Sequence, residues 1–128
     1  MLIASVLLAA AGNVGYYRTP ALTVDTLVFA AEGDLWRVPI TGGLAQRLTT
    51  HLGEETLPAI SPDGKTLAFT ASYEGPAEVY AMPLEGGAPV RLTYEGMNAA
   101  VAGFHPDGRV LYGTRRFNAT DEILALAD

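Results

Sequence analysis

A repeat of 44 residues constrains this chain more than any other feature of its sequence. The motif SPDG at residues 61–64 returns as HPDG at residues 105–108, and RLT at residues 47–49 returns at residues 91–93. Two further landmarks keep the same offset: Pro39 with Gly42-Gly43 before Pro83 with Gly86-Gly87, and residues 78–80 before residues 122–124. Self-similarity at a period of about 40–45 residues is typical of β-propellers built from four-stranded blades.

Each copy of the repeat divides into short strands between turn signals. Pro62 fixes φ and Gly64 supplies a positive φ in a turn, while Gly86-Gly87 permits a primed hairpin turn. The run TLAFTA at residues 66–71 is β-rich and apolar, as a buried strand requires. The predicted strands are 26–31, 34–38 and 44–49 in the first copy, 56–61, 66–71, 78–82 and 89–93 in the second, and 99–104, 109–114 and 121–126 in the third.

The strand pattern predicts an all-β chain of antiparallel four-stranded blades. We place the blades at about residues 15–50, 54–94 and 98–128, which makes about two and three-quarter blades. A propeller needs roughly 4–8 blades to close, so we expect an incomplete propeller. A longer parent chain would cover the exposed blade edges, and self-association through those edges is the alternative.

Composition excludes several classes of function. The chain has 128 residues and a formal net charge of −6, which disfavours nucleic acid as a partner because binding phosphates needs a basic patch. It has no cysteine, so disulfides, thiolate zinc sites and cysteine nucleophiles are excluded. His51 and His105 are the only histidines. We therefore expect no catalytic residue, no metal and no cofactor in this chain.

The N-terminal segment at residues 1–12, MLIASVLLAAAG, stands apart from the repeats. Its apolar run is too short for a membrane span of about 20 residues but fits the apolar region of a secretory signal, and three alanines supply a cleavage site. No Lys or Arg precedes Arg18, so the usual basic start is missing. We predict a signal peptide with a clipped front and a periplasmic protein, with no stable membrane span. A buried first strand or helix is the alternative.

Several single residues could suggest chemistry, but the repeat assigns most of them to structure. Ser61 lies outside any G-x-S-x-G elbow, and its counterpart is His105, so we expect both to be turn residues. Asp63 and Asp107 occupy equivalent turns, where an aspartate caps its own loop.

Three other groups have a functional and a structural interpretation. His51 lies in an inter-blade linker near Glu54 and Glu55, where a solvated loop is favoured over a metal pair. Arg115 and Arg116 are weak candidates for binding a peptide carboxylate, and a solvated loop is the alternative. Four aromatic residues fall in predicted strands and are expected in the core between blades rather than in a ligand cage: Trp36, Phe69, Tyr80 and Phe104.

The sequence also resembles a known family. GYYRTP at residues 15–20 and GDLWRVP at residues 33–39, followed by Gly42-Gly43 and RLT at 47–49, resemble the opening of the tricorn protease family. Residues 57–65 and 67–70 resemble the WD-like propeller repeat that tricorn shares with TolB, and residues 73–87 continue the tricorn-like pattern. The resemblance covers residues 15–126.

This resemblance implies a specific context. Tricorn-like proteins begin with a six-bladed propeller, continue with a seven-bladed one, and end with a PDZ-like domain and a serine-peptidase core. The propellers are thought to gate or guide peptides, and no residue here matches the catalytic positions. We therefore expect the N-terminal propeller segment of an exported tricorn-like serine peptidase, without chemistry of its own and with peptides or proteins as its partners. A TolB-like, non-enzymatic interaction propeller and a non-functional gene fragment are the alternatives.

Overall fold

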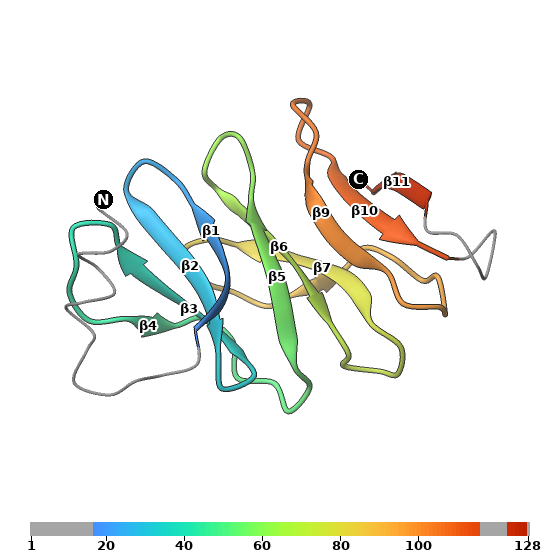
Figure 1. Cartoon of the computed structure of the whole chain (residues 1–128), viewed down its shortest axis with the longest axis horizontal. Helices are drawn as coiled ribbons and strands as arrows, with labels where there is room; N and C mark the ends of the chain where they lie inside the picture. Colours follow the sequence, from blue (N-terminus) through green and yellow to red (C-terminus); the bar gives the residue numbers. More distant parts are fainter. Residues whose placement is uncertain (1–16, 116–122, 128) are drawn as a thin grey trace.

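Three antiparallel sheets, arranged side by side, form the part of the chain that the computed structural model describes, residues 17–115 and 123–127 (Figure 1). Blade 1 contains β1 (Arg18–Leu22), β2 (Thr26–Ala31), β3 (Asp34–Pro39) and β4 (Gln46–Arg47). Blade 2 contains β5 (Glu55–Ile60), β6 (Thr66–Ala71), β7 (Glu78–Pro83) and β8 (Val90–Arg91). Blade 3 contains β9 (Ala100–Phe104), β10 (Val110–Thr114) and β11 (Ile123–Ala127). The all-β fold of antiparallel blades is confirmed.

The outermost strands are shorter than the sequence predicts. β4 and β8 have two residues each, against the predicted ranges 44–49 and 89–93. At the C-terminal ends of β4 and β8 the reason lies in the Thr that ends each RLT motif: Thr49 Oγ1 accepts a hydrogen bond from the backbone N–H of Leu35 at 2.9 Å, and Thr93 Oγ1 accepts one from Val79 at 2.8 Å. A side-chain oxygen therefore replaces the carbonyl that a longer strand would supply. β1 has no counterpart among the predicted strands, whereas β2 and β6 have the predicted bounds.

Most of the core lies in two seams between neighbouring blades, and a small third cluster, Leu27 with Val38, lies within blade 1. In the first seam, Val28 and Leu35 of blade 1 pack with Leu67 and Phe69 of blade 2. The second seam joins blades 2 and 3 and contains these buried apolar residues: Ala68, Val79, Ala99, Val101, Val110, Tyr112 and Ala127. Alternate residues of β6 thus face opposite neighbours, as the period of two in a strand requires. This explains why β6 is apolar along its whole length.

The aromatic residues predicted for the core differ in their placement. Phe69 and Tyr80 are buried in the first seam, and Phe104 packs half-buried against the second. Trp36 is half-buried and lies outside both seams, contrary to expectation. Its indole N–H donates to the Ala31 carbonyl at 3.2 Å, and its ring lies under the guanidinium of Arg47.

The first strands of the blades converge. β1 contacts β5, and β5 contacts β9, so the first strands of the three neighbouring blades lie side by side (Figure 1). We call β1, β5 and β9 the inner strands. β1 and β5 each contain an irregularity in register, where Thr19 and Leu57 precede prolines and have φ values of 45° and 51°. Positive φ is strained in residues with bulky side chains. The Leu57 N–H donates to Thr19 Oγ1 at 3.3 Å, across the two blades.

The repeated PDG turns have the predicted structural role. Asp63 Oδ1 accepts a hydrogen bond from the Lys65 N–H, and Asp107 Oδ1 accepts one from the Arg109 N–H, both at 3.0 Å. The Ser61 hydroxyl donates to Asp63 and accepts from the Thr66 N–H, so it is used within the turn. His105 Nδ1 lies 2.9 Å from Asp107 Oδ1 in the equivalent turn.

Two sequence predictions concern the membrane and the N-terminus. No helix long and apolar enough to cross a membrane occurs in the described part of the chain. The predicted signal segment at residues 1–12 lies outside the described residues.

Candidate functional site

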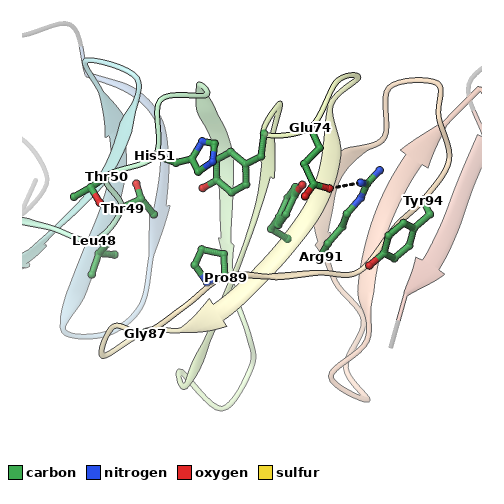
Figure 2. A pocket seen from close by; sticks show the side chains of 11 residues that line it. Leu48, Thr49, Thr50, His51, Glu74, Gly87, Pro89, Arg91 and Tyr94 are labelled. Carbon is green, nitrogen blue, oxygen red and sulfur yellow. Dashed lines mark hydrogen bonds and ion pairs between the residues drawn. The ribbon is translucent and has the colours of Figure 1, made fainter.

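A pocket of about 570 Å³ opens at the first seam, between the segment that follows β4 and the outer part of blade 2 (Figure 2). No residue of the inner strands β1, β5 or β9 lines it. Its lining residues come from two linkers, two hairpin loops and strands β7 and β8: Leu48, Thr49, Thr50, His51, Tyr73, Glu74, Tyr80, Gly87, Pro89, Arg91 and Tyr94. The pocket therefore belongs to the outer part of the seam.

Aromatic rings form a row along one side of this seam pocket. The ring centroids of His51 and Tyr73 lie 3.8 Å apart, and those of Tyr73 and Tyr80 lie 4.6 Å apart. His51 Nδ1 accepts a hydrogen bond from the Gly53 N–H at 3.0 Å, which leaves Nε2 to carry the proton of the neutral ring. The His51 side chain is exposed, as predicted for a linker residue. No group of three or more His, Cys, Asp or Glu side chains that could hold a metal occurs among the described residues.

Glu55 lies directly behind this aromatic row and is 1% exposed, although the sequence suggests a solvated linker. Its carboxylate accepts hydrogen bonds from the Thr49 hydroxyl, at 2.6 Å, and from the Tyr73 hydroxyl. Burial raises the pKa of Glu55, and these two hydrogen bonds offset part of that effect. Burial and the neighbouring carboxylate also raise the pKa of Tyr73. Glu55 therefore links blade 1 to blade 2 by hydrogen bonds.

Arg91 occupies the other end of the pocket between two carboxylates. Its guanidinium lies 2.7 Å from Glu74 Oε2 and 3.2 Å from Glu78 Oε1, and it lies 4.4 Å over the Tyr94 ring. Glu78 is 1% exposed; burial alone would raise its pKa, but hydrogen bonds from Thr93, the backbone and Arg91 lower it. The carboxylate of Glu78 therefore remains ionised beside Arg91.

The arginine candidates from the sequence do not contribute to this pocket. Arg115 is exposed just after β10 and is absent from the pocket lining, and Arg116 lies outside the described residues. Sequence reasoning missed Tyr73, Glu74 and Tyr94. A usable signal was present, because aromatic and charged residues stand together in the loops on both sides of β7.

Comparisons with known proteins agree with the architecture. The family model for the N-terminal β-propeller domain of tricorn protease matches residues 14–127. Two tricorn protease homologues of Streptomyces coelicolor are 44% and 40% identical to this chain over 61 and 64 residues. These matches cover 47% and 50% of this chain but only 5% and 6% of those relatives. The chain thus spans a small part of the length of the relatives it matches.

Solved structures show the same fold. The crystal structure of the tricorn protease superposes with a TM-score of 0.72 at 25% identity, covering 81% of this chain and 11% of that one. TolB from Acinetobacter baumannii superposes with a TM-score of 0.73 at 23% identity, covering 88% of this chain and 29% of that one. Because the family model matches nearly the whole chain, the protein belongs to the family of tricorn protease N-terminal β-propeller domains.

Proposed function

We propose that this chain is the first propeller segment of an exported tricorn-like serine peptidase and that it binds and guides peptides without chemistry of its own. Acyl transfer would belong to further domains of the parent protein. The observation that carries this proposal is the convergence of β1, β5 and β9.

Apart from Arg18 at the start of β1, the exposed positions of those inner strands are uncharged. Pro20, Leu57 and Ala102 are exposed on β1, β5 and β9 respectively. The blades of a propeller surround a central channel, and the strands that converge are the ones nearest to it. The bulge at Leu57 gives its side chain a direction that a regular strand would not allow. Beyond Arg18, such a surface would let peptides pass without anchoring their charged groups.

The test uses the full-length parent protein and peptide substrates of two lengths. Leu57→Glu should lower kcat/KM several-fold for a long peptide and leave hydrolysis of a short amide substrate unchanged, because only the long peptide must pass the inner strands. Leu44→Glu is the matched control, since Leu44 is 95% exposed outside the inner strands. Equal effects of both variants, or no peptidase activity in the parent protein, would overturn the proposal.

Export has a separate test. Expression of the chain with residues 1–12 in a bacterial host should yield a periplasmic protein that starts near Gly12 or Asn13. An unprocessed product in the cytoplasm would contradict export and leave the peptide-guiding proposal standing.

A TolB-like interaction propeller without enzymatic activity is the second candidate. It is supported by the TM-scores of 0.72 and 0.73, which are nearly equal for tricorn and TolB. Reading the gene beyond the codon for Asp128 separates the candidates. A continuation into a PDZ-like domain and a peptidase core favours the first, and further repeats followed by a stop favour the second. An immediate stop, together with failure of the purified chain to fold, favours a non-functional fragment.

A further inference from the structure

The seam pocket contains a hydrogen-bond donor that the packing of the blades does not use. Tyr80 is 5% exposed, its ring packs on Phe69 and Tyr73, and it lines the pocket. Its hydroxyl has no hydrogen-bond partner among the described residues. Burial raises the pKa of Tyr80, so the hydroxyl keeps its proton at neutral pH. A buried tyrosine ring whose hydroxyl is accessible at a pocket wall is suited to donate to a ligand oxygen such as a carbonyl.

The surroundings of Arg91 at this pocket have an excess of negative charge. In the lining Arg91 is paired with Glu74 at 2.7 Å, and Glu78, which is 1% exposed and does not line the pocket, lies 3.2 Å from the same guanidinium. Two carboxylates around one guanidinium leave a net negative charge, which favours a cationic over an anionic ligand. The Glu74 side chain is 69% exposed and lies at the pocket.

Aromatic side chains beside these carboxylates add a second attraction for cations. Figure 2 shows Glu74, Arg91 and Tyr94 at one end of the pocket, with His51 between them and the opposite end, where Thr49 and Thr50 lie. Tyr94 is 73% exposed even though one of its faces contacts Arg91. An ammonium or guanidinium group is attracted to the face of a tyrosine ring.

We propose that the seam pocket binds an extended peptide segment carrying a lysine or arginine side chain. The Tyr80 hydroxyl donates to a backbone carbonyl of the peptide, and Glu74 with the Tyr94 ring holds the basic side chain. A volume of about 570 Å³ is within the range of peptide-sized and ligand-sized pockets. Because the inner strands contribute no lining residue, this site is separate from the peptide path proposed above.

The test is a titration of the full protein, labelled with ¹³C-tyrosine, with acetyl-Ala-Lys-Ala-amide, followed by NMR. The lysine peptide should shift the Tyr80 and Tyr94 signals with a millimolar Kd, and the matched acetyl-Ala-Glu-Ala-amide should not. Glu74→Gln should weaken lysine-peptide binding about 2- to 5-fold, the range expected for exposed cation contacts. Glu85→Gln is the matched control, because Glu85 is also an exposed carboxylate paired with an arginine, Arg37, but lies outside the pocket.

A second variant separates binding from folding. Tyr80→Phe removes only a hydroxyl that has no partner among the described residues, so the thermal unfolding midpoint should not fall while lysine-peptide binding weakens. Three results would overturn the proposal: no shift at about 10 mM lysine peptide, equal binding of the glutamate peptide, or equal effects of Glu74→Gln and Glu85→Gln. Binding should persist in Leu57→Glu, so failure of the peptide-guiding proposal leaves this one testable.

Discussion

Blades 1 and 2 carry the same RLT motif, yet its threonine has a different partner in each. Thr49 donates its hydroxyl proton to Glu55, across the first seam. Thr93, at the equivalent position, donates to Glu78 within its own blade. Both hydroxyls still accept a backbone N–H, from Leu35 and Val79 respectively. The threonine of the RLT motif thus connects blade 1 to blade 2 in the first copy, and in the second copy it connects strands of its own sheet only.

The cause is a difference of two residues. Blade 2 begins with Glu55, but the position 44 residues later is Ala99, which has no carboxylate to offer Thr93. Blade 2 instead has Glu78 where blade 1 has Asp34, whose side chain is one methylene shorter and pairs with Arg47. Both copies of the threonine therefore keep the hydrogen bond that they accept from the backbone. Each hydroxyl donates its proton to the carboxylate that lies nearby, which differs between the blades.

The largest expected effect breaks the contact inside blade 2. Glu78→Ala removes the buried partner of Thr93, Arg91 and the Gly96 N–H. We expect a loss of about 3–5 kcal/mol in the free energy of unfolding, as for other broken buried pairs. Asp34→Ala should cost only about 1–2 kcal/mol, because the Arg47 side chain is 47% exposed and water can replace its partner. Urea unfolding measures both, and equal losses would contradict the comparison.

A double-mutant cycle sharpens the comparison between the threonines. Thr49→Val and Thr93→Val should each cost about 1–3 kcal/mol, because each leaves a buried backbone N–H without its acceptor. Thr49→Val should show a coupling energy of about 0.5–3 kcal/mol with Glu55→Gln, and Thr93→Val should show one with Glu78→Gln. Coupling of Thr49 to Asp34 in place of Glu55 would refute the assignment.

The two glutamates should also respond oppositely to pH. Burial raises the pKa of Glu55, so its stabilising contribution is full below the unfolded-state pKa of about 4.3 and is lost as pH rises through the folded value. The pKa of Glu78 is lowered, so its contribution is present above about 4.3 and is lost as pH falls through the folded value. Relative to Glu55→Gln, the unsubstituted protein should gain stability on acidification from pH 7. Relative to Glu78→Gln, the unsubstituted protein should lose stability below about pH 4.3. Unfolding curves across this range test both signs.

The smallest effect is expected at the exposed contact between the blades. Arg37 lies 3.3 Å from Glu85 Oε2, but the Glu85 side chain is 89% exposed. Glu85→Gln should change the free energy of unfolding by about 0–1 kcal/mol, and by less at high salt. A loss as large as that of Thr49→Val would show that exposed charge, rather than the buried hydroxyl, stabilises the first seam.

The sequence predicted what depends on local chemistry. The turns at Asp63 and Asp107 were predictable, because an aspartate caps neighbouring backbone groups in its own loop. The burial of Phe69 was predictable from its place in an apolar strand. The propeller fold was predictable because these turns and strands recur at a spacing of 44 residues.

What the sequence could not predict depends on which blade lies beside which residue. Glu55 resembles a linker residue until Thr49 and Tyr73 are placed around it, and the sequence gives no sign of its burial. The seam pocket is likewise built from segments far apart in the chain, and of its lining residues the sequence marks only His51 and Tyr80 as candidates for a role in binding. The positions of these segments relative to one another depend on how the sheets of blades 1 and 2 pack.

The backbone-to-backbone hydrogen bonds across the seams have a polarity. The Glu55 N–H donates to the Gly33 carbonyl of blade 1, and the Ala99 N–H donates to the Ala77 carbonyl of blade 2. In these bonds each blade donates to the blade before it and accepts from the one after it, whereas the side chain of Thr49 donates in the other direction. Contacts of this head-to-tail kind generate a ring when the rotation between neighbours closes and an open helix when it does not. The angle between successive blades, more than any single contact, is thus the quantity that sets the size of the assembly these blades can build.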